Sequence, residues 1–541
     1  MSNTDDEVSN KSFSVALAGL QKQNEKEIVP VVTSRTEITA GFHSNASSIS
    51  SLAVEEVKGQ KDSGLPDVLI APPLVHHCKN FSHDSGSTVD SDFQAAIVRE
   101  PWHDYEKDVL PDKTQGKAIR NLRHQVLSLY RRLFSVVFLT NIAVYITLLV
   151  RGGVHVQRLG LITLANLFVA ILMRQDYVVN IFFSVFCAVP SSWPLAIRRV
   201  CARVYHIGGL HSGCATSGVV WLAWFCGQST KEAVRGGDLP HASVATVAVS
   251  YSILLLLFGM VAFAYPALRT KRHDTFERVH RYLGWTSVIL VWAQVVLLTN
   301  DYRGKLSLSR ALVHCAPFWM VLVMSVSIIL PWLRLRKVPV RAEVLSKHAV
   351  RLYFTHTTTK SGSFIRLAMH PLKDWHAFAT IPIPNEKGFS LVVSNAGNWT
   401  QSRIMDAPTH IWVRGAPCFG LLRIAPLFRR IVLVATGSGI GPCANTLFEQ
   451  QIPIRLLWTS PDVRETFGDK FVYEILAASP DAVIYDTRKH GKPDMVKLTM
   501  RLVKEFNAEA VCVISNQKLT QKVVYGMTSR GIPAFGAIWD S

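Results

Sequence analysis

Apolar residues gather in six long runs in the middle of the chain, and polar segments separate these runs. Most of them approach the roughly 20 residues that a helix needs to cross the hydrocarbon core of a bilayer. We therefore expect a six-span transmembrane domain. The runs cover residues 133–150, 159–173, 207–226, 242–265, 282–299 and 311–333.

The second run is short and meets Arg174, Gln175 and Asp176 before another apolar stretch begins. Polar side chains are costly inside a bilayer unless they face the bundle interior or the interface. We therefore expect these three residues at the cytosolic rim of the membrane.

Lys and Arg residues beside the runs predict the orientation of the chain. With the N-terminus in the cytosol, the inner side collects more of them than the outer side, as the positive-inside rule requires. Six crossings then return the chain to the cytosol, so we expect a multi-pass membrane protein with both termini cytosolic. The inner residues are Arg131, Arg132, Arg198, Arg199, Arg203, Arg269, Lys271, Arg272, Arg334, Arg336 and Lys337. The outer ones are Arg151, Arg158, Lys231, Arg235, Arg303, Lys305 and Arg310.

Composition agrees with a membrane protein. Of the 541 residues 49% are hydrophobic and 18% are charged, and the formal net charge is +19. Much of that charge lies beside apolar runs, without the interleaved aromatic residues typical of nucleic-acid binding. We therefore expect the lipid bilayer, with anionic lipid surfaces, as the partner and no nucleic acid.

The segments around the runs differ in texture. Residues 1–115 are polar and rich in serine, which predicts a disordered cytosolic arm before the transmembrane domain of residues 116–337. Residues 338–428 contain short strand-like stretches with turn residues, typical of an antiparallel β-barrel. Residues 429–541 alternate strand-like and helical stretches, which predicts an α/β domain with a parallel, doubly wound sheet.

A glycine-rich loop follows the first strand of this last domain. Gly437, Gly439 and Gly441 lie between an apolar strand and the start of a helix. Free N–H groups and the helix dipole favour a pyrophosphate at such a place. An ordinary tight turn between strand and helix is the alternative interpretation.

The motifs in both halves, taken in order, resemble a known family. GAPCFG (Gly415, Pro417 and Gly420), a strand, and then GSGIGP (Gly437 to Pro442) resemble the ferredoxin–NADP reductase superfamily. The six preceding spans are similar to those of its membrane branch, the ferric reductases and NADPH oxidases. The resemblance covers roughly residues 130–541. VYHIGGLHSGC, FERVHRYLGW, DWHAFATIPIP and GIPAFGAIWDS look more narrowly like fungal TmpA-type transmembrane flavoproteins.

This resemblance implies cofactors and a location. FAD would bind to the barrel, and NADPH or NADH would bind to the α/β domain. Electrons would pass from the nicotinamide to the flavin and then to an unknown acceptor. The TmpA-type likeness implies the plasma membrane and a role in redox signalling during fungal development, such as conidiation.

The resemblance also points to flavin-binding residues on one barrel strand. His376 and Phe378 match the strand on which the family holds the flavin, and Trp399 and Thr400 match a neighbouring turn. Ala379 stands where the family has a hydroxyl residue. A plain barrel strand with a buried phenylalanine is the alternative.

At the nucleotide end, the segment KHGKPD resembles a turn near the adenosine of NADPH. Lys492, with Arg488 and Lys489, would meet a 2′-phosphate and so favour NADPH; a solvated basic loop is the alternative. Ile514–Asn516 replaces the family's Cys-Gly-Pro, and Trp539 is a candidate to stack on the flavin or to pack in the core.

Two histidines are candidate ligands of a single haem b. His206 begins the third run and His280 precedes the fifth, both at the cytosolic end. His211 is five residues beyond His206 and would point to another side of a helix. The outer ligands of the family's two-haem arrangement are absent, with Val219-Val220 and Ala293-Gln294 in their places. Two interfacial histidines without haem are the alternative.

Three functions remain open at this point. The first is a membrane-bound, NAD(P)H-dependent flavin oxidoreductase. The second is a regulatory membrane protein with little turnover, built on a reductase fold. The third, a transmembrane ferric reductase or superoxide-generating oxidase, is disfavoured because the outer histidines are missing.

Overall fold

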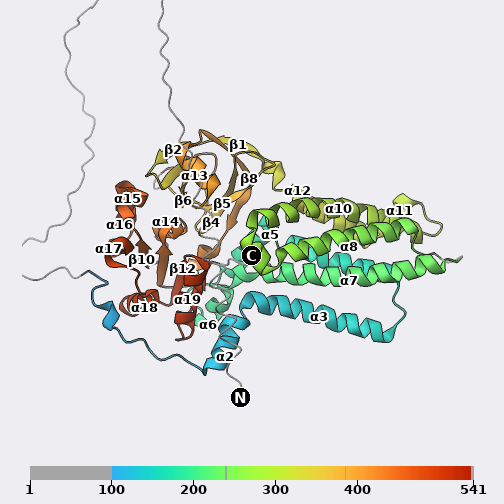
Figure 1. Ribbon diagram of the computed structural model, residues 1–541, viewed down its shortest axis with the longest axis horizontal. Coiled ribbons are helices and arrows are strands. Elements are labelled where there is room, and N and C mark those ends of the chain that lie inside the picture. The colour runs from blue at the N-terminus through green and yellow to red at the C-terminus, as the bar shows by residue number, and fades with distance from the viewer. Residues whose placement is uncertain (1–99, 238–239, 384–385, 538–541) are drawn as a thin grey trace, which may run out of the picture. The chain divides into compact units, whose positions relative to one another are not determined.

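The computed structural model describes residues 100–237, 240–383 and 386–537. Six long helices occupy the region of the apolar runs, in the expected order, and Figure 1 shows them extending from the sheets. They are α3 (Leu129–Arg151), α4 (Val156–Leu172), α7 (Gly208–Arg235), α8 (Val244–Ala264), α10 (His273–Tyr302) and α12 (Ala316–Ile329).

Four segments of the described chain are long and apolar enough to cross a membrane: Leu129–Arg151, Val244–Ala264, His273–Tyr302 and Ala316–Arg334. A fifth is added if α4 and α5 (Asp176–Phe186) are one span, although they are bent by 70°. Length and composition alone therefore support four or five of the six expected spans.

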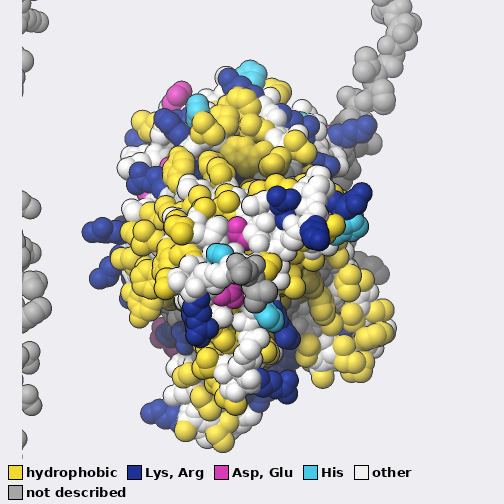
Figure 2. Space-filling model, turned by 90° about the vertical axis from the view of Figure 1, so that its right-hand side faces the viewer, with side chains coloured by type: hydrophobic (Ala, Val, Ile, Leu, Met, Phe, Trp, Pro, Cys, Tyr) yellow, Lys and Arg dark blue, Asp and Glu magenta, His cyan; other side chains and the backbone are white. Residues whose placement is uncertain are grey.

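Besides a buried core of their own, the helices carry many apolar side chains on the outside. In the most apolar window of α3, only 6% is buried inside the protein. Figure 2, which looks at the molecule from the right-hand side of Figure 1, shows wide apolar areas with Lys and Arg between them. Exposed apolar areas of this extent are typical of helices that face lipid.

Small residues bring α7 close to α3. A Cβ atom on Gly209 would overlap the carbonyl oxygen of Tyr130, and one on Gly213 would lie 3.0 Å from Cβ of Val137. Glycines four residues apart let two membrane helices approach closely, so this pair sets the contact between α3 and α7.

After α12 the chain forms two four-stranded antiparallel sheets around one core. One sheet has the order β1 (Arg336–Pro339), β8 (His410–Phe419), β4 (Ser363–Ala368) and β5 (His376–Ala379). The other has the order β2 (Arg341–Val344), β3 (Ala349–Phe354), β7 (Phe389–Ser394) and β6 (Ile381–Pro382). Apolar residues from both sheets, such as Leu352, Leu367 and Ile411, share this core.

A five-stranded parallel sheet follows, as the alternating pattern predicts. Its order is β11 (Val483–Asp486), β10 (Ile454–Ser460), β9 (Ile431–Thr436), β12 (Ala510–Ile514) and β13 (Ala534–Gly536). Helices α14 (Ile440–Glu449) and α16 (Asp469–Ala478) pack on one face. Helices α18 (Met495–Phe506) and α19 (Gln517–Thr528) pack on the other. Because both faces are covered, the central strands are continuously apolar.

The connection between α4 and α7 is part of the core of the sheets. Helices α5 and α6 (Leu195–Cys201) lie in it, and Phe183 and Cys201 share a buried cluster with Ile431 and Leu433 of β9. The Arg198 guanidinium, 2% exposed, pairs with Glu509 at 2.7 Å. The helical region is therefore joined to the sheets by buried contacts as well as by the chain.

Residues 100–121 form a strap across the nucleotide-type domain, and Figure 1 shows it passing beneath α18 toward α2 (Lys117–Asn121). Arg501 of α18 makes two bonds to the Asp108 carboxylate, of 2.6 and 2.8 Å. Thr114 N donates to Ser529 O at 2.8 Å. The prediction of a disordered arm is therefore wrong for residues 100–115, because polar anchors hold this segment. Residues 1–99 lie outside the described residues.

Candidate functional site

The glycine loop lies where the strand order reverses. β9 is followed by β10 on one side and by β12 on the other, so the loop after β9 opens on the crevice at a topological switch point. Gly437 has φ +51°, a left-handed conformation that favours glycine, and Trp458 Nε1 donates to its carbonyl at 3.1 Å. The loop is thus held by the neighbouring strand.

The three glycines of the loop have different surroundings. A Cβ atom on Gly439 would overlap the carbonyl oxygen of Ile514 at the end of β12. Cβ atoms on Gly437 and Gly441 would meet nothing within 4 Å, so these two leave room for a ligand beside the backbone. Pro442 lies in the first turn of α14, where proline is tolerated. This open backbone at a helix N-terminus fits a pyrophosphate.

A hydrogen bond crosses the crevice behind this loop. Thr436 Oγ1 and Ser515 Oγ are 2.6 Å apart, and Thr520 Oγ1 donates to Ser515 O at 3.0 Å. Asn516 caps α19 by accepting from Leu519 N. The segment Ile514–Asn516 is therefore ordered by bonds within the domain.

Aromatic rings gather on the predicted flavin strand. The Trp399 ring lies 4.3 Å from that of His376 and 5.7 Å from that of Phe378, measured between ring centroids. His376 Nε2 is buried and has no hydrogen-bond partner, and burial lowers the pKa of this imidazole. Thr400 Oγ1 closes its own turn by donating to Gly397 O. A planar ligand with a polar edge fits the strand, because it would stack on aromatic rings and satisfy the orphaned nitrogen.

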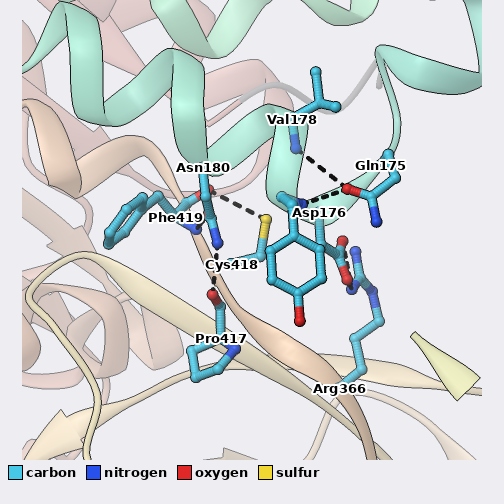
Figure 3. Close-up of polar contacts among 9 residues, drawn as sticks. Gln175, Asp176, Val178, Asn180, Arg366, Pro417, Cys418 and Phe419 are labelled. Carbon is cyan, nitrogen blue, oxygen red and sulfur yellow. Dashed lines mark hydrogen bonds and ion pairs between the residues drawn. The ribbon is translucent and has the colours of Figure 1, made fainter. Parts of the chain in front are cut away.

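The GAPCFG segment lies on β8 and contacts the rim helix α5 (Figure 3). A Cβ atom on Gly415 would lie 2.9 Å from Asp176 Oδ2, and the Pro417 carbonyl accepts from Asn180 Nδ2 at 3.0 Å. Gly420 N donates to Gly362 O at 2.7 Å.

Arg366 of β4 pairs with the Asp176 carboxylate at 2.9 Å, as Figure 3 shows. Asp176 was expected at the membrane rim, and it is 5% exposed beneath these contacts. The predicted residues of β8 therefore dock the barrel on the helical region.

One side chain joins the glycine loop to the barrel. Asn445 of α14 is 1% exposed, its Oδ1 accepts from Gly362 N at 2.6 Å, and its Nδ2 donates to Thr380 O. This amide holds the helix after the loop against the segment that follows β5. Sequence reasoning missed Asn445, and a polar residue in the apolar helical stretch after the loop was the available signal.

The predicted basic loop is exposed and partly paired. Lys489 and Lys492 are exposed, and Arg488 Nε lies 3.0 Å from Asp462 Oδ2. Two backbone amides, of Arg488 and Asp462, donate to Asp486 Oδ1. The loop therefore carries positive charge at the end of β11. Trp539, the other predicted residue of the dinucleotide end, lies outside the described residues.

The predicted haem ligands, His206 and His280, lie in a 3-10 turn and in α10, respectively. His206 lies in a 3-10 turn before α7, where its Nδ1 contacts Arg203 O at 3.1 Å. The His211 ring lies 6.3 Å from that of His280, between centroids, and His211 Nδ1 contacts Ala170 O at 2.8 Å. α7 begins at Gly208, so His206 precedes this helix and His211 lies within it. In the part of the chain that the structure describes, no group of three or more His, Cys, Asp or Glu could hold a metal ion.

Together these features define a class: a membrane-type helical region followed by two antiparallel sheets and a doubly wound sheet with a glycine loop at its switch point. Residues 421–541 match the family model described as "Adenylate-forming reductase 03009, C-terminal domain". Two relatives come from Coprinopsis cinerea. Adenylate-forming reductase 03009 is 60% identical over 465 residues, which is 86% of this chain and 45% of the relative. Adenylate-forming reductase 06235 is 56% identical over 499 residues, 88% of this chain and 48% of the relative.

The chain thus spans about half the length of the curated relatives that it matches. Among solved structures, a ferredoxin–NADP⁺ reductase from Neisseria gonorrhoeae with bound FAD and NADP is 15% identical, with a TM-score of 0.33 over 38% of this chain and 98% of its own. Phthalate dioxygenase reductase is 16% identical, with a TM-score of 0.30 over 38% of this chain and 67% of its own.

Proposed function

We propose that this chain is a membrane-bound oxidoreductase in which NAD(P)H at the glycine loop reduces an FAD on β5. The observation that carries the proposal is the buried amide of Asn445, which fastens α14 to the barrel at Gly362 and Thr380. A nucleotide on the loop and a flavin on the strand would thereby be held in one rigid frame. The name reductase of both relatives agrees with this role.

The residues present fit FAD on the barrel. The Trp399 and Phe378 rings would stack on it, and His376 Nε2 would gain the partner that it lacks. FAD, when bound, takes two electrons from the nicotinamide and can release them singly. The protein would orient the ring and keep His376 neutral, because burial lowers the pKa of that imidazole.

The dinucleotide would lie along the crevice from the glycine loop to the basic loop. Gly437 and Gly441 would let the pyrophosphate approach the backbone. Arg488, Lys489 and Lys492 would meet a 2′-phosphate, which favours NADPH over NADH.

We also propose six spans with both termini in the cytosol. The strap before α3 is bonded to α18, which follows α12 in the chain, and this contact supports an even number of crossings. An odd number such as five does not fit this arrangement. The four long apolar segments, the bent α4–α5 pair and α7 together give six spans. The basic residues on the inner side support this orientation. The resemblance to TmpA-type proteins supports the plasma membrane and developmental signalling.

A single haem b is a candidate acceptor, on His211 and His280 in place of the expected His206 and His280. Metal-ligating histidines usually hold one ring nitrogen to a carbonyl, as His211 Nδ1 does with Ala170 O. The protein reconstituted with haemin should show a Soret band that is lost in His211→Ala and retained in His206→Ala. Loss of the Soret band in His206→Ala but not in His211→Ala would instead support His206 and His280 as the ligands.

A second function, low-turnover regulation, is favoured by the hydrogen bond between Thr436 and Ser515. It joins the ends of β9 and β12, where the family places the nicotinamide. In this second function the protein binds the nucleotide without passing electrons, and the occupied nucleotide site is itself the signal.

An absorption spectrum of the detergent-purified full chain decides between these functions. We expect a flavin band after FAD is supplied, and we expect anaerobic NADPH to bleach it. A flavin band that NADPH leaves unchanged would favour the regulatory function. Absence of any flavin band would overturn the proposal.

A further inference from the structure

The strap carries an aromatic side chain to the adenosine end of the proposed dinucleotide site. The Trp102 ring lies 4.4 Å from that of His490 and 5.1 Å from that of Tyr485, between centroids. Tyr485 is on β11, and its hydroxyl donates to His490 O at 3.0 Å. An indole is thus packed on the loop that also carries Lys492.

The strap is held in place by groups other than this indole. Tyr105 is 5% exposed and its hydroxyl oxygen accepts from Asp494 N, while Lys497 Nζ donates to Glu106 O at 2.6 Å. The Asp108 carboxylate is bonded twice by Arg501. Trp102 itself is only half-buried, and its contacts with Tyr485 and His490 are edge-on or tilted. The ring is therefore positioned without being enclosed.

We infer that Trp102 completes the adenosine subsite by offering its indole face to the adenine base, with the basic loop taking the 2′-phosphate. The inference rests on the proposed function. A purine and an indole are both flat π-systems, and stacking between them tolerates small changes of angle. Arg488, Lys489 and Lys492 supply the positive charge that a phosphate on the same nucleoside requires. The subsite would thus be built from two segments almost 400 residues apart, the strap and the loop after β11.

The test measures binding of two halves of the dinucleotide to the detergent-purified full chain. Adenosine 2′,5′-bisphosphate contains the adenosine end alone, and reduced nicotinamide mononucleotide contains the other end alone. Trp102→Ala should weaken binding of adenosine 2′,5′-bisphosphate by about 5- to 100-fold, the range expected for loss of one stacked base. Binding of nicotinamide mononucleotide should be unchanged.

Two variants serve as controls. Trp102→Phe keeps an aromatic face and should restore most of the affinity, which a role in strap packing alone does not predict. His103→Ala changes the exposed neighbour in the same strap and should bind both halves as the wild type does.

Three outcomes would overturn the inference. If the wild type binds adenosine 2′,5′-bisphosphate and Trp102→Ala binds it equally well, the indole is only an anchor and the proposed function stands. If Trp102→Ala binds it more tightly, the indole blocks the subsite. If the wild type binds neither adenosine 2′,5′-bisphosphate nor NADPH, the proposed nucleotide site fails together with the inference.

Discussion

Single residues of one loop carry different tasks, although they look alike in the sequence. Gly439 is packed against the Ile514 carbonyl, whereas Gly441 borders open space. The first glycine is therefore a packing position, and the second leaves room for the proposed nucleotide. Two neighbouring glycines of one loop, Gly439 and Gly441, therefore differ in their surroundings.

Substitution of the two glycines tests this difference. Gly439→Ala should lower the free energy of unfolding by about 1–3 kcal/mol, because its methyl group would push two loops apart. Gly441→Ala should leave stability within about 0.5 kcal/mol and weaken NADPH binding, because its methyl group enters the ligand space. Melting temperature and an NADPH titration measure the two effects. A Gly439→Ala protein that melts like the wild type would show that the loops do not touch.

A second residue-scale prediction concerns pH. The Arg198 guanidinium, through its hydrogen bonds, holds the pKa of the Glu509 carboxyl below its ordinary value, with burial opposing it. A carboxyl whose pKa is lower in the folded state stabilises the fold fully above its unfolded pKa of about 4.3. This stability is lost as the pH falls through the folded-state pKa.

Glu509→Gln should therefore lower the melting temperature at pH 7 and flatten its dependence on pH below about 5. The expected cost is about 3 kcal/mol, because Arg198 would remain buried without its ion partner. Asp469→Asn is the matched control: Asp469 pairs with Arg464 at an exposed site and should change stability by less than about 1 kcal/mol. Equal effects of the two variants would contradict the prediction.

At the scale of elements, close packing and caps decide how helices begin, bend and touch. Gln175 lies at the bend between α4 and α5 and caps α5. Its Oε1 accepts hydrogen bonds from Tyr177 N and Val178 N. The glycines of α7 then bring it against α3. The partners of the Gln175 cap are adjacent in the sequence, whereas the glycines of α7 contact α3, which is distant in the sequence.

Bulky residues on α7 should separate it from α3. Gly209→Val should lower the melting temperature in detergent, with a cost of about 1–3 kcal/mol, because the Tyr130 carbonyl leaves no room for a side chain. Gly227→Val on the same helix is the control, since a Cβ atom there would meet nothing within 4 Å. If both variants melt alike, the contact between α3 and α7 contributes no stability.

At the scale of the whole described unit, the helical region and the sheets are joined at several places, among them the contacts of α5 with β8 and β4 of the barrel. The rim helices α5 and α6 enter the core beside β9, and the strap lies across α18 and α19. Electron transfer from a flavin to the membrane would need such a fixed arrangement, because its rate depends on the distance between the cofactors.

Orientation in the membrane tests this arrangement. Cysteines introduced at Lys107 in the strap and Lys470 in α16 should be labelled by an impermeant maleimide from the same side of sealed vesicles. A cysteine at Arg303, beyond the end of α10, should be labelled only from the other side. Labelling of Lys107→Cys and Lys470→Cys from opposite sides would rule out an even number of spans and the strap contact.

Much of the candidate site could be expected from the sequence, because it depends on local order. The glycine loop was predicted from a strand, three glycines and a helix start, and it lies at the switch point of a doubly wound sheet. Gly415, Pro417 and Gly420 were predicted as part of a cofactor motif, and their observed contacts are with α5 and Gly362. The sequence motif did not indicate these partners, since they come from elsewhere in the chain.

The sequence by itself determined the six helices, the strand patterns and the glycine loop. Apolar periodicity and turn residues act over a few positions, so they can be recognised without knowledge of the fold. Only the tertiary structure decided that His211 lies beside His280, that Asn445 joins α14 to the barrel, and that Trp102 reaches β11. Each of these contacts joins segments distant in sequence, and its geometry depends on where packing places whole helices and strands.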